Sequence, residues 1–188
     1  MRRLFKVTVS ALTIIMAMVF MPLTAKAELL SYDDPAAVTY YNMIPDNIKA
    51  KMNNAGVHIA VNSDMVSMRS NSGRAVGITA TTYRPGGQIV SQAIYVKYGY
   101  EDAILHEVGH FMSSYPNTIE FWTNNPTWNN IYCSEVCNAT AAGLSNANIY
   151  NASEYFAEAF QVYILNPGAL ATYCPQTYQY INILATAP

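Results

Sequence analysis

Two histidines four residues apart are the first candidates for chemistry. The segment His106-Glu107-Val108-Gly109-His110 contains two of the three histidines of the chain. Residues four apart lie on one face of a helix, so His106 and His110 can offer two imidazole nitrogens to one metal ion, with Glu107 beside them. The alternative is that both are ordinary helix residues, one buried and one exposed. The spacing favours half of a zinc site.

A second segment carries two carboxylates one helical turn apart. Glu154 and Glu158 project the same way from a predicted helix, 153–165, that is otherwise largely apolar. Burying an unpaired charge is costly, so these carboxylates need a partner, and a metal ion bound by the histidine helix would be one. A solvated acidic stripe is the alternative. A catalytic zinc site typically has three protein ligands and one open position, so a carboxylate would complete the set.

A small sheet is expected before the histidine helix. Alternating β-branched residues predict strands at 57–61 and 75–83 and one or two return strands within 88–98, with a tight turn at 84–87. We take Val90–Tyr98 as the best candidate for an edge strand that receives an extended peptide. His58, alone on a strand, is interpreted as structural.

Helix signals flank the sheet. Asp34 before Pro35 predicts a helix start, and Gly56 predicts a helix end. After Gly99 the apolar period changes from that of a strand to that of a helix. Residues 62–74 are expected to form a loop or a short helix. A proline breaks a regular helix, so the helix expected within 169–184 is interrupted at Pro175. The other expected helices lie at 35–43, 45–54, around 103–112, near 118–122, at 131–142 and at 153–165.

The paired motifs resemble a known family. His-Glu-Val-Gly-His, followed downstream by Ser-Glu-Tyr-Phe-Ala-Glu-Ala-Phe, resembles the catalytic domains of the anthrax-lethal-factor-like zinc metallopeptidases, which include secreted clostridial Pro-Pro endopeptidases. The similarity spans residues 94–165. It implies an α+β, zincin-like domain in which a small mixed or antiparallel sheet precedes the active-site helix and the C-terminal half is mostly helical.

The resemblance also implies roles for single residues. His106, His110 and Glu154 would hold one zinc ion and Glu107 would be the general base. Glu158 would accept a hydrogen bond from a ligand imidazole. The family has a tyrosine seven residues before the ligand glutamate, where this chain has Ala147. Tyr150 is our candidate for the same catalytic role, stabilisation of the oxyanion.

The N-terminus has the features of an export signal. A basic start is followed by an apolar run, Val7–Leu23, and by Ala25-Lys26-Ala27. We therefore expect residues 1–27 to be a secretory signal peptide and residues 28–188 to be a single catalytic domain, secreted without a stable membrane anchor. A retained anchor is the alternative interpretation.

The remaining charge argues against nucleic acid as a partner. Without residues 1–27, six basic residues face twelve acidic ones, a formal charge of −6. Nucleic-acid binding depends on basic residues that neutralise phosphates. A protein or peptide substrate is the expected partner.

Three cysteines lie in the expected exported part. Cys133 or Cys137 could reach Cys174, and we expect one disulfide that involves Cys174. Metal binding by Cys133 and Cys137 is a competing interpretation.

These observations predict a secreted zinc metalloendopeptidase. Its general base, Glu107, would remove a proton from a zinc-activated water. One alternative is an exported zincin-fold binding or toxin-accessory domain without peptidase activity. Another is a purely structural zinc with a fourth protein ligand, such as a cysteine.

Overall fold

The computed structural model describes residues 28–70, 74–85, 89–116 and 121–187. The predicted signal peptide, residues 1–27, lies outside the described residues, as do parts of the expected turn at 84–87 and of the expected helix at 118–122. Among the described helices, none is long and apolar enough to cross a membrane.

The described residues of the N-terminal half contain three short helices besides the sheet. Helices α2 (Pro35–Met43) and α3 (Asp46–Ala55) confirm the expected segments. The Asp34 carboxylate accepts hydrogen bonds from the backbone at the start of α2, and Gly56 ends α3 in the left-handed conformation that glycine adopts without a steric cost. Residues 62–74 contain one further helix, α4 (Ser63–Arg69).

The sheet has four strands among the described residues, in the order β1-β2-β4-β3. The inner strands β2 (His58–Val61) and β4 (Ile89–Val96) are parallel, and β3 (Gly77–Tyr83) pairs with β4 in the antiparallel direction. The two-residue strand β1 (Glu28–Leu29), which we did not predict, runs parallel to β2. The sheet is therefore mixed, as expected.

The predicted edge strand is wrong. Val90–Tyr98 largely coincides with β4, which lies between β2 and β3 and has neighbours on both sides. Within the described part of the chain the two edge strands are β1 and β3, because β4 pairs with both β2 and β3. Strand order depends on such tertiary connections, which a local sequence pattern does not record.

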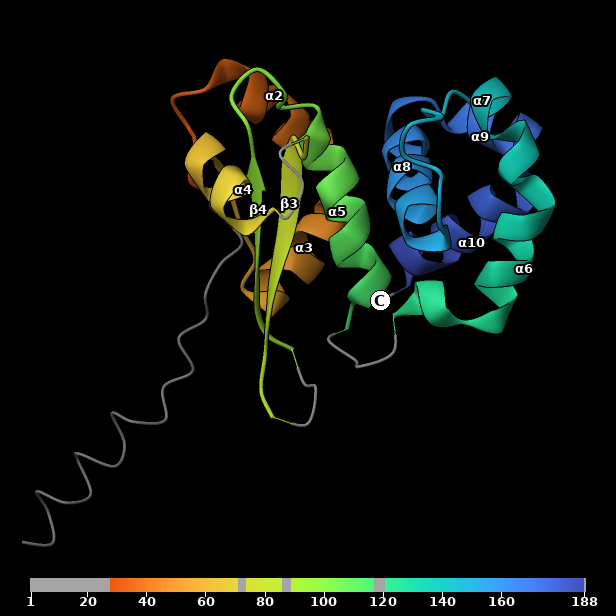
Figure 1. Ribbon diagram of the computed structural model, residues 1–188, viewed down its shortest axis with the longest axis horizontal. Coiled ribbons are helices and arrows are strands. Elements are labelled where there is room, and N and C mark those ends of the chain that lie inside the picture. The colour runs from red at the N-terminus through yellow and green to blue at the C-terminus, as the bar shows by residue number, and fades with distance from the viewer. Residues whose placement is uncertain (1–27, 71–73, 86–88, 117–120, 188) are drawn as a thin grey trace, which may run out of the picture.

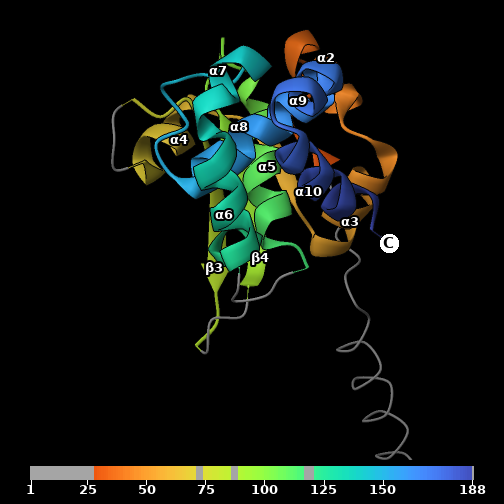
Figure 2. The ribbon, with the colours of Figure 1, turned by 90° about the vertical axis from the view of Figure 1, so that its right-hand side faces the viewer.

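Helix α5 (Ala103–Ser114) follows the sheet directly and carries the histidine motif. It lies between the strands on one side and helix α8 (Ala152–Leu165) on the other (Figure 1). In Figure 2 the C-terminal helices lie in front of α5 and the strands lie behind it. The buried hydrophobic residues of both halves form one cluster, to which α5 contributes Leu105, Val108 and Phe111.

The C-terminal half is mostly helical, with boundaries that differ from those expected. The predicted helix 131–142 is three elements, α6 (Pro126–Glu135), the 3-10 turn Val136–Asn138 and α7 (Ala139–Ala142). The Asn125 side chain caps α6, and Pro126 occupies its first position. A second 3-10 turn lies at Trp122–Asn124, and the expected break at Pro175 separates α9 (Pro167–Tyr173) from α10 (Pro175–Thr186).

The expected disulfide is absent. All three cysteines are free thiols: Cys133 and Cys137 are exposed on α6 and the turn after it, whereas Cys174 is buried between α9 and α10. The Cys174 Sγ lies 3.8 Å from the carbonyl oxygen of Glu135 and donates to it. The buried thiol therefore contacts the end of α6 rather than another sulfur.

Candidate metal centre

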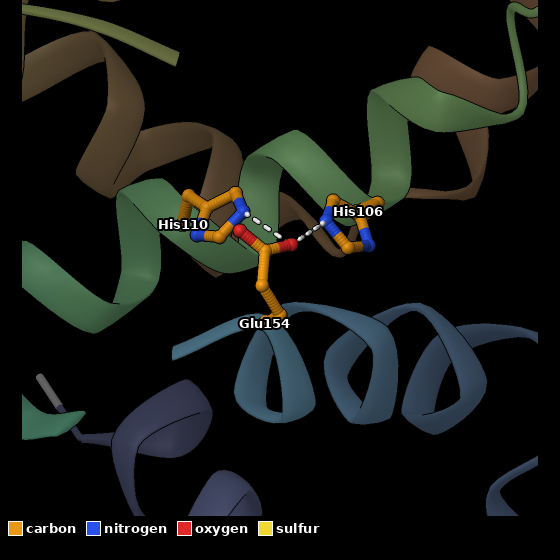
Figure 3. Close-up of side chains that lie close together, drawn as sticks. All are labelled: His106, His110 and Glu154. Atoms are coloured by element: carbon orange, nitrogen blue, oxygen red, sulfur yellow. Dashed lines mark hydrogen bonds and ion pairs between the residues drawn. The ribbon is translucent and has the colours of Figure 1, made fainter. Parts of the chain in front are cut away.

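The two motif histidines and Glu154 meet in space. Nε2 of His106 lies 3.3 Å from Oε2 of Glu154, and Nε2 of His110 lies 3.6 Å from the same oxygen. Figure 3 shows the Glu154 side chain rising from α8 between the two rings of α5. The three side chains are 12%, 26% and 21% exposed for His106, Glu154 and His110, so each reaches the surface of a cleft.

The distances suit a single divalent ion. The ligand atoms of His106, His110 and Glu154 all lie within 4.8 Å of one another. Two ligands at about 2.0–2.1 Å from a tetrahedral zinc ion lie about 3.3–3.4 Å apart, close to the two distances to Glu154. Within the described ranges, this is the one group of three such side chains, and it contains no cysteine.

The Glu158 carboxylate contacts Nδ1 of His106, the ring nitrogen that is not directed at Glu154. Its Oε2 lies 3.1 Å from Nδ1 of His106 and accepts a hydrogen bond from the Asn148 amide at 3.0 Å. Its Oε1 accepts from the backbone N–H of Ser145 at 2.9 Å. With a proton fixed on Nδ1, a neutral His106 presents the lone pair of Nε2 toward Glu154 and His110. Glu158 therefore contacts one of the two motif histidines, and its role toward a ligand of a bound metal stays a prediction.

The charges of the cluster favour a bound cation. Burial alone would lower the pKa of His106, but hydrogen bonds to Glu154 and Glu158 raise it to about 9. Burial would raise the pKa of Glu154, but hydrogen bonds from both histidines hold it well below its ordinary value. The pKa of Glu158 is also lowered, against the effect of burial, mainly by the hydrogen bond with His106. A proton on both nitrogens of His106, or a metal ion in place of one, satisfies the two carboxylates.

Glu107 faces the opposite wall of the cleft. The Thr79 hydroxyl of β3 lies 2.7 Å from Oε2 of Glu107. Glu107 as a whole residue is only 6% exposed, yet it borders the same cleft as the two histidines and Glu154. The structure thus brings Glu107 beside the cluster without making it part of the cluster.

Tyr150 lies at the rim, beside Glu154. The negative charge of Glu154 raises the pKa of the Tyr150 hydroxyl, with smaller contributions from burial and from a hydrogen bond with Glu154. The residue is 70% exposed and borders the cleft, as does Ala147 at the position of the family tyrosine. The replacement that we expected from the sequence is therefore compatible with the geometry.

The cleft has a volume of about 930 Å³ and runs between the edge strand and the loop before α8. Gly77, Thr79, Thr81 and Tyr83 of β3 form one wall, while Asn148 and Tyr150 lie on the other. Thr79, Ser145 and Asn148 were not predicted from the sequence. The alternating threonines of β3 were the available signal for Thr79, because they repeat on one face of a strand.

Comparisons with known proteins agree with this architecture. A solved structure, the Pro-Pro endopeptidase PPEP-2 from Paenibacillus alvei, superposes with a TM-score of 0.53 at 16% sequence identity, covering 85% of this chain and 97% of that chain. The fold is that of an α+β, zincin-like metallopeptidase domain. The family model for the anthrax toxin lethal factor, N- and C-terminal domain, matches residues 75–184, and the chain belongs to this family. No curated protein sequence matches the chain.

Proposed function

We propose that this protein is a secreted, zinc-dependent metalloendopeptidase. One observation carries the proposal: Nε2 of both motif histidines faces a single oxygen of Glu154, at 3.3 and 3.6 Å, in a cleft that Glu107 also borders. Metal-binding side chains and a carboxylate free of the metal cluster are the two parts that hydrolysis by this class of site requires.

His106, His110 and Glu154 would hold one zinc ion. Two imidazole nitrogens and one carboxylate oxygen are a donor set that zinc accepts, and they leave one position of a tetrahedral site for water or substrate. Bound zinc supplies a Lewis acid that polarises a carbonyl oxygen and lowers the pKa of water toward ~7.

The remaining steps belong to the side chains. Glu107 takes the proton of the attacking water and passes it to the amine that leaves, since its carboxylate lies at the cleft and outside the metal cluster. Tyr150 donates its hydroxyl proton in a hydrogen bond to the oxygen that becomes negative in the transition state. Glu158 keeps the tautomer of His106 fixed throughout.

A peptide is the substrate that the cleft accommodates best. Strand β3 is one of the two edge strands of the sheet among the described residues, and it forms a wall of the cleft. An extended peptide can pair with such an edge through its main chain, which places a peptide carbonyl near the cluster whatever its side chains are. This supports an endopeptidase rather than an enzyme for small esters or amides.

Export is proposed from residues 1–27. Their basic start, apolar run and Ala-x-Ala ending have the composition of a cleaved signal peptide. The substrate would then be an extracellular protein or peptide.

A second candidate is an exported binding or toxin-accessory domain that cleaves nothing. The observation in its favour is Ala147, which stands where the family has a tyrosine. The retained Glu107 argues against it, because metal binding alone does not require a carboxylate there.

A metal count and a peptide-library assay with and without chelator separate the candidates. The expected result is one zinc per chain and cleavage that stops on chelation. Glu107→Ala should keep the zinc and lose the activity, whereas Glu154→Ala should lose most of the zinc. Full zinc occupancy with no cleavage of any peptide would favour the accessory domain.

A further inference from the structure

We propose that Thr79 positions the carboxylate of Glu107 for proton transfer, and that Gly77 provides the space in which this carboxylate lies. The inference rests on the proposed peptidase function and adds two residues of the edge strand to it. Both residues lie on β3, and both lie against the side chain of Glu107 on α5.

The hydrogen bond from Thr79 is directed at the charge of Glu107. The Thr79 hydroxyl lies 2.7 Å from Oε2 of Glu107 and 2.9 Å from the Glu107 carbonyl oxygen. A hydroxyl has one proton to donate, and a carboxylate is a stronger acceptor than a neutral carbonyl. The proton therefore points to Oε2.

This contact determines which way Glu107 points. One residue along a helix is a rotation of about 100°, so Glu107 cannot face α8 as its neighbour His106 does. It faces β3 instead, where the carboxylate of this buried residue would be costly without a hydrogen-bond donor. Thr79 is that donor.

The hydrogen bond from Thr79 makes the two carboxylate oxygens of Glu107 inequivalent. Within the part of the chain that the structure describes, the hydrogen bond to the Glu107 carboxylate ends on Oε2. Oε1 is left to accept a proton from a water in the cleft. A base held by one oxygen keeps its other oxygen at a fixed position, and proton transfer depends on that position.

Gly77 lies where any side chain would displace the carboxylate. A β-carbon at Gly77 would stand 2.7 Å from Oε1 and 2.9 Å from Cγ of Glu107, closer than real β-carbons approach. The backbone of Gly77 is not in the left-handed region, so its conformation does not call for glycine. Space for Glu107 is the reason that remains.

The test compares substitutions on the two faces of β3. Thr79→Val keeps the size and branching of the side chain and removes the hydroxyl, whereas Thr79→Ser keeps the hydroxyl. Thr82→Val is the matched control, because Thr82 is exposed and its side chain is on the opposite face from Thr79. Zinc content, kcat and KM are measured for each purified variant on one library-derived peptide.

A positioning role predicts a particular pattern. Thr79→Val should lower kcat by about ten- to hundredfold, part of the effect of a general base, while KM stays within about twofold and zinc stays at one per chain. Thr79→Ser should keep at least about a third of the wild-type kcat, and Thr82→Val should match the wild type.

Gly77→Ala tests the space around the carboxylate independently. Thr79 is intact in this variant, yet the added methyl group competes with Oε1 and Cγ of Glu107. We expect kcat to fall at least as far as in Thr79→Val, again with one zinc per chain. Crystal structures of the metal-free Thr79→Val and Gly77→Ala proteins should show Glu107 moved from its wild-type position.

The outcomes separate this inference from the proposed function. Wild-type kcat in Thr79→Val, or a Glu107 side chain that stays in place in both crystal structures, overturns the role of Thr79 while the peptidase assignment stands. Zinc lost in parallel with kcat also overturns it, because the residue would then be structural. If the wild type cleaves no peptide, the peptidase proposal fails, and the metal-free structures still decide whether Thr79 and Gly77 hold the carboxylate.

Discussion

Gly109 of α5 lies directly against the backbone of Ala157 of α8. A β-carbon at Gly109 would stand 2.7 Å from the Cα of Ala157 and 3.0 Å from its carbonyl oxygen. The two helices therefore touch backbone to backbone at this point. His106 and His110 stand on α5, and Glu154 and Glu158 stand on α8. The close approach of the two helices brings these side chains into contact.

We expect Gly109→Ala to weaken both folding and zinc binding. The added methyl group cannot be accommodated by a flexible side chain, because its nearest neighbour is backbone, and overpacking of this kind costs about 1–3 kcal/mol. Urea unfolding and a competitive zinc titration measure the two effects. Gly168→Ala is the control, since a β-carbon there meets nothing within 4 Å. Equal zinc affinity in Gly109→Ala and the wild type would show that the helix contact does not set the ligand distances.

Glu158→Gln should lower the affinity for zinc by about ten- to hundredfold, the usual effect of changing a partner of a ligand histidine. The amide keeps the shape of the side chain but removes the charge that orients His106. Glu135→Gln is a matched control, because Glu135 is also buried but accepts its hydrogen bonds from Gln176 and Thr177 at the start of α10. It should reduce stability without changing the zinc titration. An unchanged titration for Glu158→Gln would contradict the role of this carboxylate.

The metal-free protein should lose stability as the pH rises from about 6.5 to about 9. The pKa of His106 is raised from 6.5 to about 9 in the folded chain, so its ionic hydrogen bonds contribute fully below the unfolded value and disappear above the folded one. The pKa values of Glu154 and Glu158 are lowered in the folded chain, so these two carboxylates affect stability at acidic pH. Stability should fall as the pH drops below about 4.5 and they become protonated. Thermal unfolding in chelator across this range measures the effect. His106→Ala should remove the alkaline slope, and a slope that persists in this variant would assign it to other groups.

Tyr150→Phe should reduce kcat by about ten- to hundredfold and leave KM nearly unchanged. The hydroxyl would act only on the charge that develops in the transition state, and removal of one such donor typically costs 10²–10³ in kcat, less at a site as open as this one. Peptide hydrolysis under saturating substrate is the measurement. Tyr173→Phe, on the exposed part of α9, is the control. A wild-type kcat in Tyr150→Phe would remove Tyr150 from the catalytic group and leave Ala147 without a replacement.

The elements that were predicted well are those whose signals lie in a few adjacent residues of the chain. Helix α2 was expected from Asp34 and Pro35, and the structure shows the cap that these residues form. The Asn125-Pro126 start of α6 is a signal of the same kind that we did not use, and as a result the helix was placed too late in the chain.

Contacts between distant segments were harder to predict. The approach of Glu154 to His106 was expected because both residues belong to motifs with a known chemical purpose. The bond from Thr79 to Glu107 was not expected, because alternating threonines indicate which residues share a face of a strand but not which helix residue they meet. The position of β3 at the edge was missed for a related reason, since it depends on where the later strand β4 inserts.

The proposed metal ligands come from both halves of the molecule: the two histidines stand on the helix that packs against the sheet, and Glu154 stands on a helix of the C-terminal half. An ion bound between them would stabilise the folded chain in addition to any part it takes in catalysis. Saturating zinc, at about a thousand times its Kd, would add about 4 kcal/mol to the stability of the folded chain. Stripping the ion should therefore make the whole protein melt earlier and become easier to digest, and calorimetry with and without chelator would reveal this even before any substrate is known.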